Sequence, residues 1–528
     1  MASYQTVAAP RTESAREWKR AMAVVGVLAL ARIALYLFIA PRYDYFRDEL
    51  YYLACGEHPA WGYVDQPPMI AWLTWLVRHT IGTSLYALRL LPALAGAALV
   101  VMTAQFARDS GARKSGVWLA GLAALVAPIY LAMSHLWTMN AFDPLIWGGC
   151  ARVMLRIVRG GNPRLWLLFG ALAGVGLLNK YGIAFYLAAL LAGVLLTPAR
   201  RHLASPWLWA GIGLAAIIAL PNLIWQVQHG FPFLELMRNI RASGRDVALP
   251  PLQFLVQQAL MVNPLGFLLA IFGVIYSFTR SGREFRFLAI AYLVFTAMMM
   301  WMKAKDYYLA PVYPVMIGAG AAQLERWTDR AAGAPRVRLL AAAPFGVAAL
   351  LVAFGIFAAP LAVPVLTQEQ FIAYEKAIGF TPPPSEHQPR GPLPQIFADM
   401  HGWRETAAEV AKYYNSLPPE ERAKTAIFAE NYGGAGAIDF FGPQLGLPKA
   451  ISGHQSYYFW GPRDYTAESL IIVGAGDDKE MRREFASVEK VGQVNSYYAR
   501  PDTNRPIFHA RGWKHDIRTD WWRAKHWD

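Results

Sequence analysis

The chain has 528 residues, of which 55% are hydrophobic and 16% are charged, and its formal net charge is +14. This composition, with a mean hydropathy of +0.25, excludes an ordinary soluble globular protein and indicates a polytopic membrane protein. A large share of the basic residues lies in short loops between apolar runs, where Lys and Arg orient membrane helices, so the charge does not indicate nucleic-acid binding. The two cysteines, Cys55 and Cys150, provide no disulfide framework.

The first apolar run, 21–40, predicts a transmembrane helix, because it is too long for a signal peptide and has no small-residue cleavage site. With the runs that follow it, the pattern predicts a mostly α fold, a membrane bundle of about eleven transmembrane helices and at most roughly 13. The runs lie at 21–40, 85–107, 115–134, 137–157, 165–180, 181–198, 206–226, 252–278, 286–302, 307–325 and 337–360.

The loops between these runs predict the orientation of the chain. If the helices alternate, basic residues such as Arg16, Lys19, Arg200 and Arg201 fall on one side. The positive-inside rule makes that side cytoplasmic, so we expect a cytoplasmic N-terminus. The opposite, outer loops carry the acidic residues discussed next.

The first outer loop contains adjacent carboxylates in "YFRDELYYLACGEHP", residues 45–59. On a helical wheel Asp48 and Tyr52 share the face opposite the leucines, and Glu49 lies on the flank of the apolar face. An interfacial helix would therefore point Asp48 into an aqueous cleft, which makes it the preferred catalytic base, with Glu49 beside it. The alternative is that these acids only solvate a loop or pair with neighbouring arginines.

Two further outer segments contribute candidate site-shaping residues. Asp65 opens the segment "DQPPMIAWLTWL", where consecutive prolines suit the start of a helix or a re-entrant segment. Asn140 and Asp143 lie in "SHLWTMNAFDPLIW", at the outer mouth of the fourth run. Asp143 before a proline is also typical of a plain N-cap, and that alternative stays open.

Several basic residues break the positive-inside rule and lie in outer loops. Snorkelling at the bilayer edge is one explanation for each lysine. The shared side favours another, because an anionic lipid phosphate needs cations whereas a hydroxyl acceptor needs a carboxylate. The candidate phosphate-binding residues are Lys303, Lys305, Lys180, Arg241, Arg245, Tyr307 and Tyr308.

The pattern changes after residue 360. We predict a transmembrane domain over 1–360, a Pro-rich linker over 361–395 and a soluble α/β domain over 396–528, on the outer side. Within that domain, periodicity predicts helices over 403–417 and 437–446 and buried strands over 424–430 and 469–476.

The order and sidedness of these motifs are similar to those of the C superfamily of polytopic glycosyltransferases, particularly bacterial relatives of protein O-mannosyltransferases and aminoarabinose lipid A transferases. The correspondence covers about residues 20–360. The motifs that carry it are Asp48-Glu49, Gln66-Pro67-Pro68-Met69, Asp143 and the segment from Tyr308 to Pro314.

This resemblance implies a polyprenyl-phosphate sugar as donor and a protein, lipid or polysaccharide hydroxyl as acceptor. Transfer would occur at the periplasmic face of a bacterial cytoplasmic (inner) membrane. Asp48 would deprotonate or orient the acceptor, and the sugar would invert in one displacement. Lys303 and Lys305 would ease departure of the phosphate.

The sequence departs from relatives at Gln66, where some carry Lys, and at Tyr307, where many carry His. Lys180, Arg241 or Arg245 would then compensate in binding the phosphate. We predict no metal or other cofactor, although outer carboxylates with a phosphate could hold Mg²⁺ or Mn²⁺.

The main rival interpretation is a membrane transporter or lipid flippase, which predicts mid-bilayer ionisable groups and inverted repeats. The sequence shows no evident repeat, and its distinctive charges lie on one face. The soluble domain is interpreted as acceptor-binding or as shielding of the cleft. Its "GGAG" stretch lacks the spacing of a nucleotide-binding loop.

Overall fold

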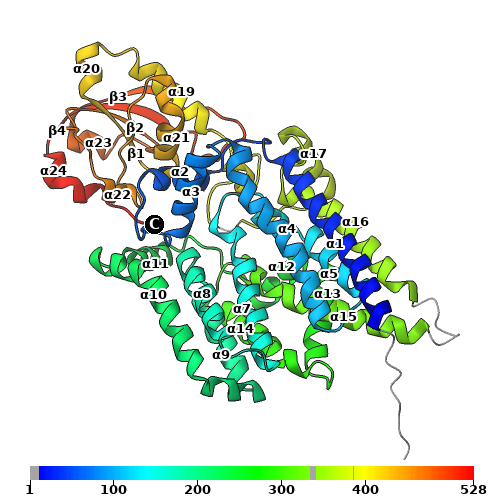
Figure 1. The fold of residues 1–528 in the computed structure, drawn as a ribbon. Helices are drawn as coiled ribbons and strands as arrows, with labels where there is room; N and C mark the ends of the chain where they lie inside the picture. Colours follow the sequence, from blue (N-terminus) through cyan, green and yellow to red (C-terminus); the bar gives the residue numbers. More distant parts are fainter. Residues whose placement is uncertain (1–10, 333–340, 385) are drawn as a thin grey trace, which may run out of the picture. The chain divides into compact units, whose positions relative to one another are not determined.

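The computed structural model describes residues 11–332, 341–384 and 386–528 (Figure 1), and it is mostly helical. The chain forms two compact units. The first unit consists of Met1–Ala40, Arg89–Leu220 and Ala248–Val363, and the second consists of Pro41–Leu88, Pro221–Val247 and Pro364–Asp528.

The first unit is built from packed apolar helices, with α13 against α15, α9 against α14, α7 against α8 and α5 against α1, α15 and α16. Its elements, some of which extend into the second unit, are α1 (Arg11–Ile39), α4 (Leu85–Asp109), α5 (Ser115–Val126), α6 (Pro128–Met133), η1 (Met139–Ala141), α7 (Asp143–Val158), α8 (Leu165–Asn179), α9 (Ile183–Leu195), η2 (Pro198–Ala204), α10 (Pro206–Gln228), α12 (Pro251–Val262), α13 (Pro264–Ser277), η3 (Arg283–Phe285), α14 (Arg286–Trp301), η4 (Asp306–Val312), α15 (Tyr313–Ala332) and α16 (Ala343–Ala362).

Each predicted apolar run contains a helix, although the last run, 337–360, begins outside the described residues. Among the described residues, five helices are long and apolar enough to cross a membrane, or up to seven if each of two bent pairs is one span. These pairs are α9 with η2, bent by 110°, and α12 with α13, bent by 108°. The number of spans therefore stays a prediction.

The bend in the predicted run 252–278 has a local cause. Asn263 ends α12 with a positive φ of 76°. Its side chain then accepts a hydrogen bond of 3.1 Å from the backbone N–H of Leu265 and caps α13, while Pro264 takes the first helical position. The sequence alone indicates one continuous run here, because both halves are apolar.

The second unit contains a four-stranded sheet in the order β1-β2-β4-β3. All five residues of β2 are buried, as expected for a strand that is covered on both faces of the sheet. The elements are α2 (Arg47–Glu57), α3 (Met69–Thr80), α11 (Pro232–Ser243), α17 (Gln368–Ile378), α18 (Gln395–Ala398), α19 (Trp403–Tyr414), α20 (Pro419–Lys424), β1 (Thr425–Ala429), α21 (Tyr432–Phe441), η6 (Gly442–Leu445), α22 (Tyr457–Trp460), β2 (Ser469–Val473), α23 (Met481–Glu484), β3 (Phe485–Gln493), β4 (Pro506–Trp513), α24 (Ile517–Asp520) and η7 (Trp521–Ala524).

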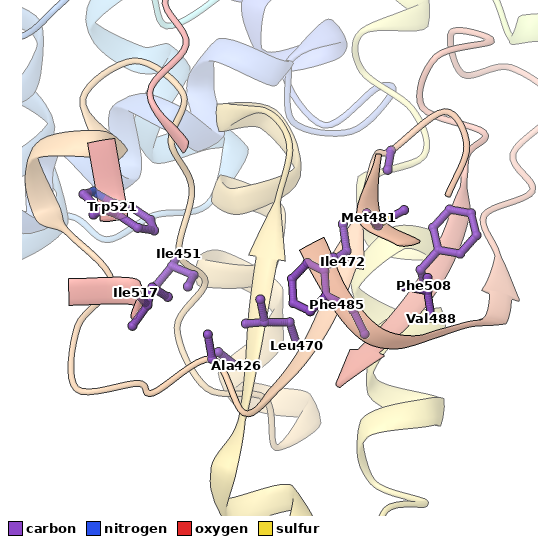
Figure 2. Packing of buried hydrophobic residues seen from close by; sticks show 13 residues of the cluster. Ala426, Ile451, Leu470, Ile472, Met481, Phe485, Val488, Phe508, Ile517 and Trp521 are labelled. Carbon is purple, nitrogen blue, oxygen red and sulfur yellow. The ribbon is translucent and has the colours of Figure 1, made fainter. Parts of the chain in front are cut away.

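The strands β1 and β2 pair in parallel, with Ile427 opposite Ile471, and β4 runs antiparallel between β2 and β3. Figure 2 shows the buried cluster on this sheet, which includes Leu470, Ile472 and Phe508. The predicted strands and both predicted helices are confirmed as β1, β2, α19 and α21 with η6. The strands β3 and β4 were not predicted, because charged and polar residues interrupt their apolar pattern.

The predicted linker 361–395 is helical in part. Thr367 caps α17 by accepting a hydrogen bond of 3.3 Å from the backbone N–H of Gln370, and Gly379 ends the helix in the left-handed conformation with φ 61°. The Pro-rich segment follows from Phe380, and its residue 385 lies outside the described residues.

Two glycines allow α21 to lie directly on α2, within the second unit. A Cβ atom added at Gly436 would lie 2.9–3.1 Å from the backbone carbonyl and Cβ of Leu50 on α2. One added at Gly433 would lie 2.7 Å from the Arg47 side chain. The "GGAG" stretch is therefore explained by helix packing, which needs the missing side chains at these two positions.

The substitution Gly436→Ala should consequently separate the two helices and destabilise the protein by about 1–3 kcal/mol, the usual cost of overpacking. The matched control is Gly434→Ala in the same helix. Its added Cβ would meet Ala429 at an ordinary 3.5 Å, so it should be neutral or stabilising by up to about 1 kcal/mol. Thermal unfolding of the full chain in detergent measures both. Equal shifts for the two variants would contradict the packing argument.

Candidate active site

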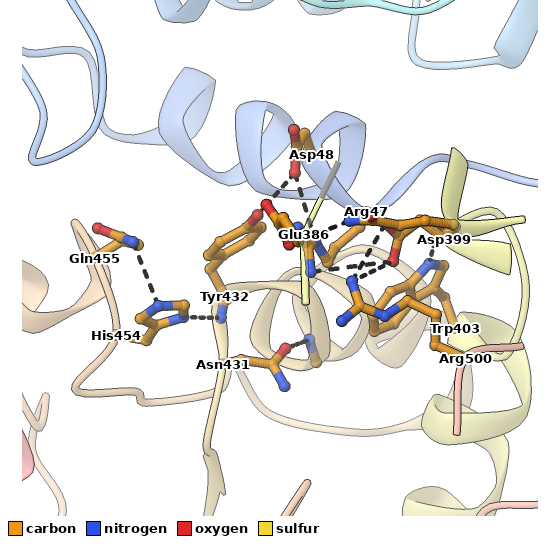
Figure 3. A network of polar contacts seen from close by, with 12 residues as sticks. Arg47, Asp48, Glu386, Asp399, Trp403, Asn431, Tyr432, His454, Gln455 and Arg500 are labelled. Atoms are coloured by element: carbon orange, nitrogen blue, oxygen red, sulfur yellow. Dashed lines mark hydrogen bonds and ion pairs between the residues drawn. The ribbon is translucent and has the colours of Figure 1, made fainter. Parts of the chain in front are cut away.

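Asp48 lies in the first turn of α2, where a carboxylate is favoured by the helix dipole. Its side chain is 29% exposed. The hydroxyl of Tyr432, the first residue of α21, donates a hydrogen bond of 2.8 Å to Asp48 Oδ1, and Arg47 Nε lies 3.6 Å from the same oxygen (Figure 3). The carboxylate is therefore held through one oxygen by groups of its own unit, and part of it stays accessible.

Glu49 is fully buried and has a structural partner. Its Oε2 accepts a hydrogen bond of 2.9 Å from the backbone N–H of Phe46, the residue that precedes α2. A glutamate three residues into a helix commonly satisfies an orphan N–H in this way. Its predicted catalytic role stays a prediction, whereas its capping role is visible.

A buried ionic network is connected to Asp48 through Arg47 (Figure 3). The Asp399 side chain is 2% exposed, and Arg500 Nη1 donates to its two oxygens at 3.2 and 3.4 Å. The Arg47 backbone N–H donates to the Asp399 carbonyl at 2.9 Å, and the Arg47 guanidinium lies over the Tyr432 ring at 5.1 Å. Arg47 thereby connects the start of α2 to residues that follow the Pro-rich segment.

Asp65 is also brought close to Asp48. It accepts a hydrogen bond of 2.8 Å from the Tyr51 hydroxyl. Burial raises the pKa of Asp65 to about 7; the Tyr51 hydrogen bond opposes this rise, and the charge of Asp48 adds to it. Burial likewise raises the pKa of Tyr52, and the charges of Asp48 and Asp65 add to that rise. These predicted residues thus form one electrostatic group.

Arg245 belongs to the edge of this group. Its charge acts on Asp65, and its guanidinium lies 3.6 Å from Glu386. Arg241 is exposed, and none of the described contacts joins it to Asp48 or Asp65. Of the two predicted arginines, only Arg245 is therefore placed with the carboxylates.

The other predicted residues form a cluster in the first unit. Asp143 begins α7 and accepts a hydrogen bond of 2.8 Å from the Asn179 amide, at the end of α8. The ammonium of Lys180, which follows Asn179, donates to Asn140 Oδ1 at 2.6 Å. The segments "HLWTMNAFDP" and "LLNKYG" therefore lie in contact.

Lys180 also lies against η4. Its ammonium is 4.6 Å from the ring centre of Tyr308 and 5.3 Å from that of Tyr307, close enough for cation–π contacts. Burial lowers the pKa of Lys180, in the loop between α8 and α9, to about 8; the carboxylate of Asp143 opposes this and the charge of Lys305 adds to it. Two lysines thus share one partly apolar environment, which suits an anion.

Among the described contacts, none joins the Lys303 side chain to this cluster. It is exposed and has a positive φ of 52° after the end of α14. Among the described residues, no group of three His, Cys, Asp or Glu side chains gathers as a metal site. The arrangement therefore offers a partly exposed carboxylate in one unit and a lysine–tyrosine cluster in the other.

Sequence reasoning missed Tyr432, Asp399 and Arg500. Tyr432 precedes the glycines of "NYGGAG", which were weighed only as a nucleotide loop. The signal that could have identified it is the pair of glycines three residues apart, since small residues at that spacing form a flat helix face. Asp399 and Arg500 are separated by 101 residues, and no local pattern connects them.

A family model described as dolichyl-phosphate-mannose-protein mannosyltransferase matches residues 65–225. A lipid A galacturonosyltransferase, RgtD from Rhizobium johnstonii, is 28% identical over 188 residues, which is 35% of this chain and 39% of that protein. The chain thus matches about two fifths of that relative's length.

Among solved structures, ArnT from Cupriavidus metallidurans has a similar fold. The structure bound to undecaprenyl phosphate has a TM-score of 0.55 and 16% identity, covering 92% of this chain and 97% of ArnT. The apo structure has a TM-score of 0.52, 15% identity and the same coverage. At these identities the likeness concerns the fold.

These matches confirm the predicted resemblance to the polytopic glycosyltransferases of the C superfamily. They include relatives of the two predicted kinds, the protein mannosyltransferases and the transferases that modify lipid A. The relatives are membrane glycosyltransferases, and the fold is that of a polytopic protein with a small C-terminal sheet.

The pKa of Asp65 predicts a pH-dependent stability. The folded protein keeps this proton up to about pH 7, whereas the unfolded chain loses it near pH 4. The contribution of Asp65 to the free energy of unfolding therefore falls as the pH rises between these values, by at most about 4 kcal/mol, and is constant above them. In detergent, the thermal midpoint of the wild type should fall relative to that of Asp65→Asn between pH 5 and 7. A difference independent of pH would contradict the assignment.

Proposed function

We propose that the protein is a membrane glycosyltransferase that moves a sugar from a polyprenyl-phosphate donor to an acceptor hydroxyl by inverting displacement at the periplasmic face. The observation that carries the proposal is the Asp48 carboxylate, held through Oδ1 by Tyr432 and partly exposed. The family model that begins at residue 65, in the same loop region, supports the reaction class.

In this mechanism Asp48 is the general base. The acceptor hydroxyl donates to the carboxylate, and its oxygen attacks the anomeric carbon of the donor sugar. The proton passes to Asp48 as the new C–O bond forms, while the bond from the anomeric carbon to the phosphate oxygen breaks. The electron pair of the broken bond leaves with the polyprenyl phosphate. Because the acceptor attacks the face opposite the leaving phosphate, the anomeric configuration inverts.

We assign the donor phosphate to Lys180 and Lys305, with Tyr307 and Tyr308 lining the same cluster. Two cations in a partly apolar environment stabilise the charge that develops on a leaving phosphate more strongly than they would in water. The undecaprenyl phosphate bound to ArnT, which has the same fold, supports this donor class. Asp143 and Asn140 hold Lys180 in place through the contacts described above.

The acceptor is a hydroxyl of a lipid, protein or polysaccharide, and the curated relative acts on lipid A, which favours a lipid. We place the protein in the bacterial cytoplasmic membrane with a cytoplasmic N-terminus and the domain 396–528 in the periplasm. This orientation follows from the distribution of basic residues.

The first test of this proposal is loss of a glycan in cells. Deletion of the gene should remove a sugar from one envelope lipid, protein or polysaccharide, and Asp48→Asn should fail to restore it, with transfer at least about 100-fold lower. Asp44→Asn is the matched control, because Asp44 precedes α2 in the same loop as Asp48 but forms its ion pair with the exposed Arg404 of α19. Mass spectrometry of the envelope fractions measures the glycan. Normal transfer by Asp48→Asn at equal expression would exclude it as the base.

A second test separates the lysines. The change Lys305→Met keeps the aliphatic stem but removes the charge, so the KM for a polyprenyl-phosphate sugar should rise about tenfold or more. Exposed Lys303, two residues away, provides the control, and Lys303→Met should change KM by less than about threefold. A larger rise in KM for Lys303→Met than for Lys305→Met would contradict the assignment, because it would place the phosphate at the lysine outside the cluster.

A further inference from the structure

We propose that Tyr432, from the C-terminal part of the chain, is a positioning residue for the catalytic base Asp48. This inference rests on the proposed function. It gives the C-terminal domain a part in catalysis, in place of the binding or shielding roles that the sequence suggested.

Tyr432 acts as a hydrogen-bond donor because its hydroxyl keeps its proton. Burial raises the pKa of its phenol well above the usual value; Arg47 opposes this rise, and Asp48 adds to it. The hydroxyl therefore keeps its proton and donates it to Asp48 Oδ1 at 2.8 Å. A hydrogen bond to an ionised carboxylate is stronger than one between neutral groups, so it fixes the direction of the carboxylate plane.

Both neighbours of the Asp48 carboxylate use the same oxygen. Tyr432 and Arg47 each approach Oδ1, and none of the described contacts is made to Oδ2. A carboxylate offers about four lone-pair sites. Fixing Oδ1 from one side thus leaves Oδ2 for the hydroxyl of an incoming acceptor.

The Tyr432 ring is itself held on several sides. It stacks on His454 with ring centres 5.1 Å apart (Figure 3), and it contacts the Tyr51 ring in a tilted arrangement with ring centres 4.7 Å apart. Its backbone N–H donates to His454 Nδ1 at 3.1 Å. Asn431 caps α21 by accepting from the backbone N–H of Gly434 at 2.9 Å. These contacts are more than a surface tyrosine needs, and they direct its hydroxyl to one point.

The close packing of α21 on α2 completes the arrangement. Gly436 and Gly433 remove the side chains that would separate the two helices at Leu50 and Arg47. The position of the Tyr432 hydroxyl relative to Asp48 is therefore set by the backbone of two packed helices. Such support is what a precisely oriented base requires.

The test uses the purified full chain and a bacterial lipid extract containing undecaprenyl-phosphate sugars, with release of undecaprenyl phosphate as the measured rate. We expect Tyr432→Phe to lower the maximal rate by about 10- to 100-fold, the loss of one hydrogen bond to a charged group, with little change in the KM for the donor. Tyr414→Phe is the matched control: it removes a hydroxyl that donates to the Arg422 carbonyl in the same domain, and the rate should be unchanged.

Replacement of Tyr432 by 4-aminophenylalanine provides the rescue, because the ring keeps an N–H donor at the same position. We expect at least half of the wild-type rate, and this variant decides alone if Tyr432→Phe does not fold. A folded Tyr432→Phe with a wild-type or higher rate would overturn the inference, and a higher rate would mean that the phenol occupies the acceptor's place. A folded 4-aminophenylalanine variant as slow as Tyr432→Phe would also overturn it.

The same assay distinguishes the two levels of the argument. If the wild type and Asp48→Asn release undecaprenyl phosphate equally, the proposed function fails. If Asp48→Asn is inactive while Tyr432→Phe is fully active, only the positioning role fails.

Discussion

The packing of α21 on α2 is the constraint on which the proposed active site depends. The helices α2 and α21 can approach this closely only because Gly433 and Gly436 present backbone where other residues would present side chains. The approach has a chemical consequence, since the first residue of α21 then reaches the carboxylate of Asp48. In the proposed site, packing and catalysis are therefore linked through a single pair of helices.

Ion pairs around the start of α2 explain why charged groups such as Asp399 and Arg500 can be buried near the candidate site. Arg47 stands between Asp48 and Asp399, and Arg500 donates to Asp399 from a distant part of the chain. Removing one member of such a network leaves an uncompensated buried charge, which is costly. The network therefore connects Asp399 and Arg500 to the start of α2, which carries the proposed base.

Much of the fold could be predicted because it follows from local patterns. Apolar runs mark the helices of the first unit, and continuous apolar segments mark β1 and β2. The prediction was less complete where tertiary contacts, and not local patterns, determine the secondary structure. The strand β3 carries Glu489 and Lys490 and pairs with β4 along its length. Asn263 breaks a run that is apolar on both sides of it.

The candidate site could be predicted to a similar extent. Asp48, Lys180 and Lys305 became candidates because charges at the predicted outer face of a membrane protein need an explanation. Tyr432 could not be found in this way, since its role depends on a helix contact between residues far apart in the chain. Lys303 and Lys305 were indistinguishable by sequence, and the structure separates them, because Lys303 is exposed whereas Lys305 is half-buried and its charge acts on Lys180.

The central claim is that Asp48 activates a hydroxyl for attack on a lipid-phosphate sugar. The most direct measurement is the stereochemistry and stoichiometry of one turnover, with purified protein, undecaprenyl-phosphate sugars and an envelope lipid extract, followed by NMR and mass spectrometry. The account predicts one undecaprenyl phosphate released for each glycosylated product, with inverted anomeric configuration, and neither product with Asp48→Asn. Retained configuration, or turnover that survives Asp48→Asn, would contradict it.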